Sequence, residues 1–226
     1  MAVSQASIAI DFQTVQLSAV LGMLGSLTVI VCNTTLYLHG DPAQWSQWSL
    51  NLAYWAGSIA LPVASLGYLQ LLVGLRPAGR WWSVPPVIAL MYFFALGSAG
   101  HGSCFPVYEF WQGFEQSAEA LTIAPVADLK TDLERHMGVL MSVAMAAMFI
   151  GSMWFSATVW FKETLYPRWM AFLNVFMISV PVVVVSQIDV LPDIIQIIAA
   201  GLGFHLGAIA LMMTSLLMLR RRFQLD

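Results

Sequence analysis

Charged residues are scarce in this sequence. Asp, Glu, Lys and Arg make up only 9% of its 226 residues, whereas about 25% is usual in soluble domains. Hydrophobic residues make up 59%, which is more apolar surface than a soluble fold of this length can bury. The composition therefore predicts an integral membrane protein. The net charge of −3 also excludes the strongly basic surface that nucleic acid binding requires.

Several motifs of enzymes and metal sites are also absent. The chain contains no HExxH, no paired-histidine iron signature, no GxSxG and no CxxC sequence. It has two cysteines, and the second of them, Cys104, follows His101 by three residues. These two side chains share a helix face and could both ligate a metal, but the spacing alone predicts none. We therefore expect no cofactor, with a metal or a haem as open alternatives.

Six hydrophobic segments are long enough to cross a bilayer, which takes about 20 residues per helix. Lipid cannot satisfy open backbone groups, so each crossing segment is expected to be helical. No remaining segment is long enough to form a soluble domain. We predict an all-α polytopic transmembrane bundle of six helices, a single transmembrane domain over residues 1–226. The expected spans are residues 17–38, 48–75, 82–104, 137–161, 169–188 and 193–219.

Positive charge is divided unequally between the two sides of this bundle. Seven of the nine Lys and Arg residues fall after the second span, after the fourth span, or at the C-terminus, and these regions share one side. The other side has only Lys130 and Arg135. The positive-inside rule then predicts that both termini are cytoplasmic, in a multi-pass protein of the bacterial inner membrane type.

The longest connection, between the third and fourth spans, contains an amphipathic stretch at residues 107–121. Its apolar residues at 107, 110, 111 and 114 recur at the spacing of one helical face. Glu115 and Glu119, one turn apart, would face water. We expect a short amphipathic helix on the outer surface here.

Histidines and carboxylates gather toward the outer side of the expected spans. His101 comes about 19 residues into the third span, which is about 28 Å of helix and close to the outer rim. His205 lies deeper, about 18 Å into the sixth span, so the two histidines are expected to differ by about 16 Å in depth. That difference disfavours haem ligation by the pair. A titratable side chain as deep as His205 is costly to place, and it usually faces the bundle interior.

The second and third spans carry further polar and small residues. On the second span, Asn51, Trp55, Ser58, Pro62 and Ser65 share one helical face. Pro62 lacks an N–H, so it should free a backbone carbonyl. In the stretch GSAGHGSCFP at residues 97–106, the small residues are expected to serve helix packing. His101 itself either bonds a backbone carbonyl near the interface or takes part in a site.

A hydrophobic bundle with such a rim suits an apolar substrate that has a reactive polar end. We predict an integral membrane enzyme that performs acid–base chemistry, such as isomerisation, cyclisation or hydrolysis, on a lipid- or isoprenoid-like molecule in the outer half of the bundle. The alternatives are a transporter or ligand-binding protein without bond chemistry, and a structural subunit. The expected partners are the lipid bilayer and a hydrophobic small molecule, and the oligomeric state is left open. The candidate acid–base residues are His101, Glu109 and Asp189, and the candidate substrate-binding residues are Asn33, Tyr37, Asn51, Tyr54, Trp55 and His205.

The first half of the chain also resembles known sequences. The stretch GMLGSLTVIVCNTTLYLHGDP at residues 22–42 and the SAGHGSCFP end of the third span resemble uncharacterised bacterial six-helix membrane families, the domain-of-unknown-function type. The resemblance implies a six-helix bundle and no known activity. In that pattern an aspartate often stands where this chain has Asn33, so an acidic role shared with the family is not expected at this position.

Overall fold

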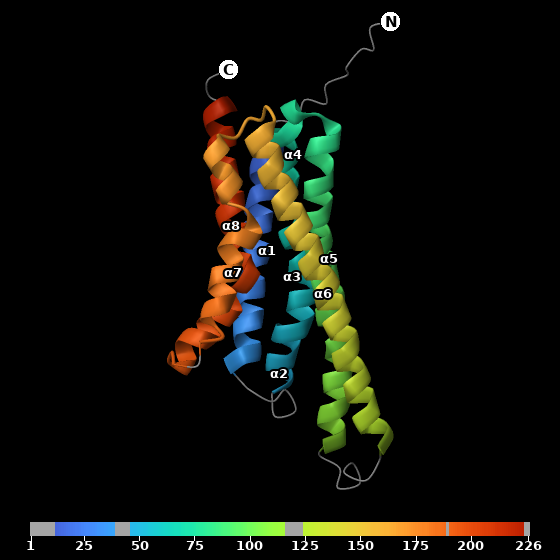
Figure 1. The fold of residues 1–226 in the computed structure, drawn as a ribbon. Coiled ribbons are helices and arrows are strands. Elements are labelled where there is room, and N and C mark those ends of the chain that lie inside the picture. The colour runs from blue at the N-terminus through green and yellow to red at the C-terminus, as the bar shows by residue number, and fades with distance from the viewer. Residues whose placement is uncertain (1–11, 39–45, 116–123, 189, 224–226) are drawn as a thin grey trace, which may run out of the picture.

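The apolar segments of the chain form long helices, as the hydrophobic composition requires. The computed structural model describes residues 12–38, 46–115, 124–188 and 190–223, and every regular element in these residues is helical (Figure 1). The first span is α1 (Phe12–Leu38). The second consists of α2 (Gln47–Leu50), the π-helical η2 (Asn51–Ala56), α3 (Gly57–Leu66), α4 (Leu69–Leu75) and the 3₁₀ turn η3 (Arg76–Ala78). The others are α5 (Arg80–Glu115), α6 (Ala124–Phe161), the 3₁₀ helix η5 (Arg168–Phe172) with α7 (Val175–Val185), and α8 (Asp193–Phe223).

Six helical segments of the described chain are long and apolar enough to cross a membrane. They agree closely with the expected spans, and the prediction of an all-helical, six-span membrane protein is confirmed at this level. The segments are Phe12–Thr35, Gln47–Ala78, Arg80–Ser103, Arg135–Phe161, Arg168–Val185 and Gly201–Phe223.

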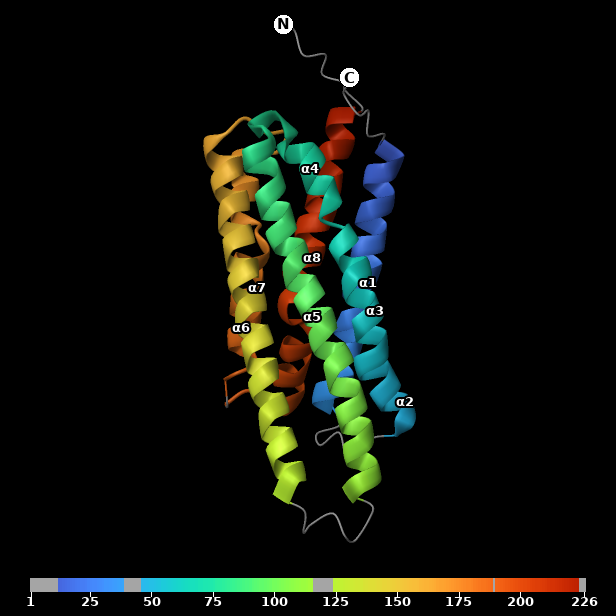
Figure 2. The ribbon, with the colours of Figure 1, turned by 90° about the vertical axis from the view of Figure 1, so that its right-hand side faces the viewer.

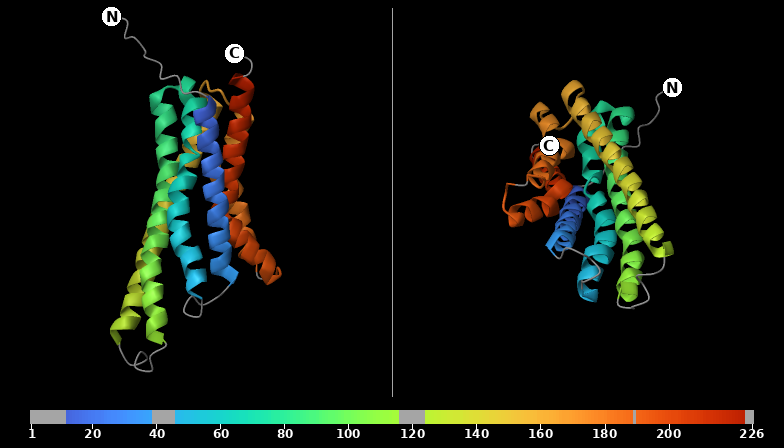
Figure 3. Two further views of the ribbon diagram at one scale, coloured as in Figure 1. Left: turned by 180° about the vertical axis from the view of Figure 1, so that it is seen from behind. Right: turned by 60° about the horizontal axis from the view of Figure 1, so that its bottom comes forward.

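The spans follow one another around the bundle in the order of the sequence. α1 packs against α3, α3 against α5, and α5 against α6, while α7 packs against α8. Figure 2 shows α5 between α6 and α3, and both views in Figure 3 show the same succession of helices. α8 also packs against α1, and α6 contacts η5 and α7, so the six spans form a closed ring.

The two ends of this ring are different. At one end the rings of Phe12 and Phe223 contact each other, with their centroids 5.4 Å apart. We call it the basic end, because it holds Arg76, Arg80, Lys162, Arg168 and Arg220–Arg222. The other end, where α1 and α7 finish and α8 begins, is the cavity end. There α5 and α6 extend well beyond the other helices (Figure 1).

The extension of α5 bears on the expected outer helix. Residues 107–115 are helical, but they continue α5 and do not form a separate element. Residues 116–121 of the expected helix lie outside the described residues. A distinct amphipathic helix on the outer surface therefore stays a prediction.

Candidate functional site

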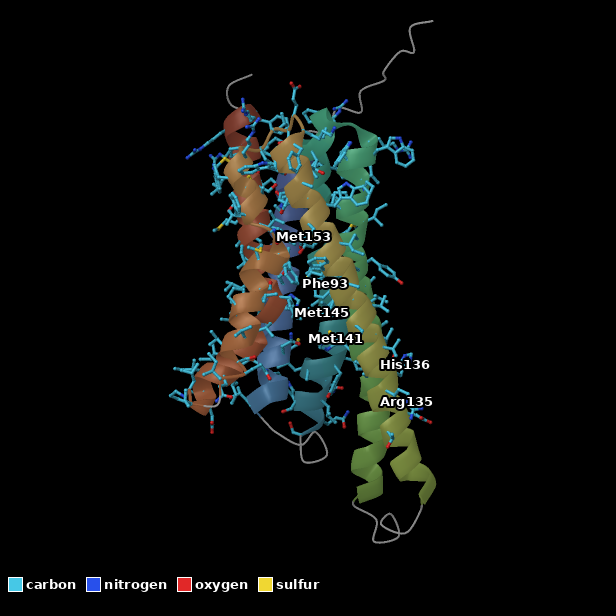
Figure 4. The ribbon with its side chains drawn as sticks, in the orientation of Figure 1. Phe93, Arg135, His136, Met141, Met145 and Met153 are labelled. Atoms are coloured by element: carbon cyan, nitrogen blue, oxygen red, sulfur yellow. The ribbon has the colours of Figure 1, made fainter. Side chains whose placement is uncertain are left out.

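A cavity of about 310 Å³ lies between the helices in the half of the bundle near the cavity end. All six spans contribute to its wall, which is mostly apolar, and Figure 4 labels two of the apolar residues, Phe93 of α5 and Met141 of α6. None of the described residues that line it is Asp, Glu, Lys or Arg. The polar lining residues are Asn33, Tyr54, His101, Ser186, Gln187 and His205.

His101 is held against the second span by a hydrogen bond. Its Nδ1 lies 3.1 Å from the Ala53 carbonyl oxygen. A carbonyl oxygen only accepts, so Nδ1 carries the hydrogen and donates it. Nε2 has no hydrogen-bond partner among the described residues, and His101 lines the cavity, so Nε2 is the nitrogen left for a ligand.

The local structure of the second span explains why the imidazole can come so close. Within η2 the Gly57 N–H donates to the Tyr54 carbonyl, whereas in a regular α-helix it would donate to that of Ala53. Gly57 also leaves room for the ring, because a Cβ at this position would lie 2.6 Å from Nδ1 of His101. The π-helical turn and Gly57 together allow the imidazole of His101 to pack closely against the second span.

A second bond between α5 and the second span confirms the expectation for Pro62. The proline has no N–H to donate to the carbonyl of Ser58, four residues earlier. The Ser98 hydroxyl donates to this Ser58 carbonyl at 2.6 Å. Ser98 and His101 are three residues apart on α5, so they share a face and both bond backbone carbonyls of the second span. His101 is therefore a packing residue as well as a cavity residue.

His205 reaches the same cavity from α8, close to an interruption of that helix. Gly203 has φ 33° and ψ −128°, which breaks the helical geometry and which only glycine adopts easily. Two residues later, His205 is 5% exposed, and its ring meets the edge of Phe94 with centroids 5.6 Å apart. Its Nδ1 is buried and has no hydrogen-bond partner among the described residues.

The structure thus brings His101 and His205 onto one cavity, which their expected difference in depth did not anticipate. That expectation treated His101 as the last turn of a span, but α5 continues for 14 residues beyond it to Glu115. In the described part of the chain, the cavity included, no group of three or more His, Cys, Asp and Glu side chains is placed to hold a metal ion.

The other candidate residues divide into three groups. Asn33 and Tyr54 line the cavity with the two histidines. Asn51 and Trp55 are exposed and do not line this cavity. Their face of the second span turns outward at the π-helical turn. The side chains of Tyr37, Cys104 and Glu109 and all of Asp189 lie outside the described residues; on α5, Glu109 follows His101 by about 12 Å of helix.

His101 lines the cavity, but two other polar residues of the same half of the bundle, His136 and Asn51, do not. His136 is exposed on α6, and Figure 4 shows it on the outside of the bundle beside Arg135. Asn51 is exposed on the second span. The polar ring that partners His101 in the cavity is instead that of Tyr54, with centroids 6.2 Å apart.

Sequence reasoning missed the contribution of α6. Met137, Leu140, Met141 and Ala144 line the cavity at the spacing of one helical face. This pattern was available in the sequence, but its four residues are all apolar, so residue type did not single them out. Gly203 was also missed, because the sequence GLGFHLG gives no reason to prefer it over Gly201 or Gly207 as the point of interruption.

Comparison with known proteins assigns the chain to a family but not to an activity. No curated protein and no solved structure matches it. The model of a family of unknown function, DUF6796, matches residues 33–222, far beyond the first half of the chain in which the resemblance was recognised. This range starts at Asn33 and includes every residue that lines the cavity. The chain therefore belongs to the DUF6796 family of unknown function.

Proposed function

We propose that the protein is an integral membrane enzyme that performs acid–base chemistry on a hydrophobic, lipid- or isoprenoid-like molecule bound in this cavity. The observation that carries the proposal is the hydrogen bond from His101 Nδ1 to the Ala53 carbonyl. It fixes the orientation of the ring and leaves Nε2 toward the ligand, which is the arrangement of a positioned general base. His205 provides a second imidazole on the same cavity.

The character of the lining supports a neutral substrate. No described lining residue carries a formal carboxylate, ammonium or guanidinium charge. A charged head group would therefore lie in apolar surroundings without a counter-ion, which is costly. A head with carbonyl or hydroxyl oxygens can bond the amides of Asn33 and Gln187 and the two imidazoles. Isomerisation, cyclisation and hydrolysis all remain compatible with such a head.

The arrangement of the helices supports entry from the bilayer. Figure 1 shows α6 and α7 diverging toward the cavity end, and the bottom view in Figure 3 agrees. Both helices line the cavity, through Met141 of α6 and Val183 of α7 among others. A molecule already dissolved in the membrane would reach the histidines between these two helices without crossing water.

A binding protein without bond chemistry is the second candidate. It is favoured by the lack of any carboxylate among the described lining residues and by the packing role that His101 already has. In this case the same molecule would enter and leave unchanged.

Substitution of His101 separates the two candidates. An asparagine at this position can still donate to the Ala53 carbonyl but cannot act as a base, so His101→Asn should keep the fold and the bound ligand and lose turnover at least 100-fold. The ligand is identified by mass spectrometry of the purified protein, and the product by comparing lipid extracts of cells that express each variant. His136→Asn is the matched control, because His136 is exposed and outside the cavity.

If the protein is an enzyme, we expect a lipid species that forms in cells expressing the wild type or His136→Asn but not in cells expressing His101→Asn. Identical lipid extracts from all three, together with the same ligand bound to each, would leave only the binding protein.

We also propose that both termini are cytoplasmic, as in the bacterial inner membrane. Support comes from the positive residues gathered at the basic end. Single cysteines at Gly79 and at Gln44, in a background without Cys32 and Cys104, test the orientation. Reagents that cannot cross the membrane should label position 44 from outside and leave position 79 unlabelled, and the opposite result would reverse the topology.

A further inference from the structure

Two imidazoles line the cavity from opposite sides of the ring of helices. His101 belongs to α5, which packs mainly against α3 and α6, whereas His205 belongs to α8, which packs mainly against α1 and α7. In His101, Nδ1 donates to the Ala53 carbonyl, so in the neutral ring Nε2 carries no hydrogen and can only accept a bond. In His205 only Nδ1 is both buried and unpaired. Since Nε2 also has no partner among the described residues, it is the nitrogen with accessible surface in the cavity.

The two imidazoles are about 10 Å apart along the axis of the bundle. The ring of His205 packs against Phe94 of α5, with centroids 5.6 Å apart, so these two side chains lie at similar depth. His101 follows Phe94 by seven residues, which is nearly two full turns, so it projects from the same face of α5. Gly97 lies between them on this face and lines the cavity. Because it has no side chain, it does not fill the space between the imidazoles.

The walls between the two imidazoles are apolar and partly aromatic. Phe93 and Phe204 line the cavity and meet edge to face, with centroids 5.7 Å apart. Met141 of α6 lines the cavity and is also 51% exposed, so the cavity reaches the surface of the bundle at this residue. Aromatic edges and methionine thioethers both make favourable contacts with a flat ring.

The spacing and the volume of the cavity match one six-membered ring with an oxygen at each end. Two oxygens placed para on such a ring, with a hydrogen bond of about 2.8 Å beyond each, span about 11 Å. The volume of about 310 Å³ is at the small end of the range for ligand pockets, so it holds a head group and not a whole lipid. A tail attached next to one oxygen leaves sideways from the line that joins the two oxygens. It can therefore pass between α6 and α7 into the bilayer.

We propose that the substrate is a quinol with an apolar tail. One hydroxyl of its para-dihydroxy ring donates to Nε2 of His101, and the other bonds Nε2 of His205. A quinone carbonyl in the first position would face the lone pair of the His101 nitrogen with no hydrogen between them, so the quinol should bind more tightly than its quinone. The assignment rests on the proposed function, in which His101 takes the proton of this hydroxyl. The O–H bond breaks, an N–H bond forms, and the oxygen keeps the electron pair as a phenolate.

Three probes with the same tail test the head group on the protein in nanodiscs under nitrogen. They are decylhydroquinone, decylphenol and decyl-para-benzoquinone, each partitioned between nanodiscs with and without the protein. Decylhydroquinone should bind at least about fivefold more tightly than the others, because each of them lacks one of its two hydrogen bonds. Equal affinity for hydroquinone and quinone would overturn the hydroxyl at His101, and equal affinity for hydroquinone and phenol would overturn the second oxygen at His205. No protein-dependent binding of the hydroquinone would overturn the proposal as a whole.

Two substitutions assign each oxygen to its histidine. His205→Phe keeps a ring against Phe94 and removes both nitrogens, so it should weaken decylhydroquinone binding about fivefold and leave decylphenol binding unchanged. His101→Asn keeps a donor to the Ala53 carbonyl and removes Nε2, so it should weaken both probes. His136→Asn, outside the cavity, is the control and should change neither. An equal loss of both probes in His205→Phe would contradict the assignment of the second oxygen.

The wild type alone decides if either variant fails to fold, because the order of the three probes depends on no substitution. Lipid extracts of expressing cells test the proposed function separately. If the probes bind in the expected order but no lipid is converted, the proposed function fails and the quinol site stands. If the wild type converts a lipid whose head has no second ring oxygen, the proposed function stands and the quinol assignment is overturned.

Discussion

The basic end and the cavity end of the bundle satisfy their polar groups in different ways. At the basic end, α6 and its connection to α7 form hydrogen bonds to neighbouring elements. The Leu165 N–H donates to the Gly74 carbonyl at 2.8 Å, and the Thr158 hydroxyl donates to the Trp82 carbonyl at 3.1 Å. At the cavity end, a π-helical turn and a break at Gly203 interrupt the helices, and Nδ1 of His205 has no hydrogen-bond partner in the described part of the chain.

This difference separates the part of the molecule that stabilises it from the part that is available for chemistry. Interrupted helices and unpaired donors lower stability, and proteins retain them mainly at functional sites. Two such interruptions, the π-helical turn and the break at Gly203, border the cavity, so they bear on its function. Three substitutions, one at the basic end and two around the cavity, test this difference between the two ends.

The largest effect is expected at the basic end, from Asn174→Ala. Asn174 is 2% exposed, caps α7 by accepting from the Met177 N–H at 2.8 Å, and donates to the Ser156 hydroxyl at 2.8 Å. Losing the cap and leaving buried partners unpaired should lower the free energy of unfolding by about 3 kcal/mol. Thermal unfolding in detergent measures this. Asn51→Ala, on the exposed surface of the cavity end, is the control and should change it by less than about 0.5 kcal/mol.

A smaller loss of stability is expected for Gly203→Ala, but with a larger effect on the cavity. Alanine at φ 33° is strained, and the free energy of unfolding should fall by about 1–2 kcal/mol. The strain relaxes by straightening α8, which moves His205, so the amount of lipid that copurifies should fall several-fold. Gly138→Ala, in a regular turn of α6 with open space around it, should be neutral or slightly stabilising. Equal lipid content in both variants would show that the break does not shape the cavity.

The smallest effect is expected for Ser98→Ala. It removes the donor to the Ser58 carbonyl that Pro62 leaves open, and it should cost about 1 kcal/mol of unfolding free energy. Ser103→Ala removes a hydroxyl that only bonds the Ala99 carbonyl of its own helix, so a value near zero is expected. Similar values for the two serines would mean that the bond between α5 and the second span contributes nothing to stability.

Much of the fold could be predicted because it follows from hydropathy. The six spans and the free carbonyl created by Pro62 both rest on local properties of the chain. The length of α5 could not be predicted in this way. Gly102 and Pro106 are typical of a helix end, but α5 continues through both, because it packs along α6 over most of its length. Tertiary contact outweighed local preference there.

The candidate site was predictable only in part, for a related reason. Asn33, Tyr54, His101 and His205 were recognised from residue type and approximate depth, and all four line the cavity. Asn51 and Trp55 lie within the π-helical turn Asn51–Ala56, where the spacing of a regular α-helix does not hold. Counting residues along a regular helix therefore placed Asn51 and Trp55 in the site, whereas they are exposed.

The closed ring of spans also has a consequence for how the protein is made. The helices that hold Asn33, Tyr54 and His101 precede α8 in the chain, whereas Gly203 and His205 belong to α8, which docks between α7 and α1. Until α8 docks, the cavity lacks one of its six walls and stays open. Docking of α8 is thus the step that closes the ring of the six described spans and encloses the cavity.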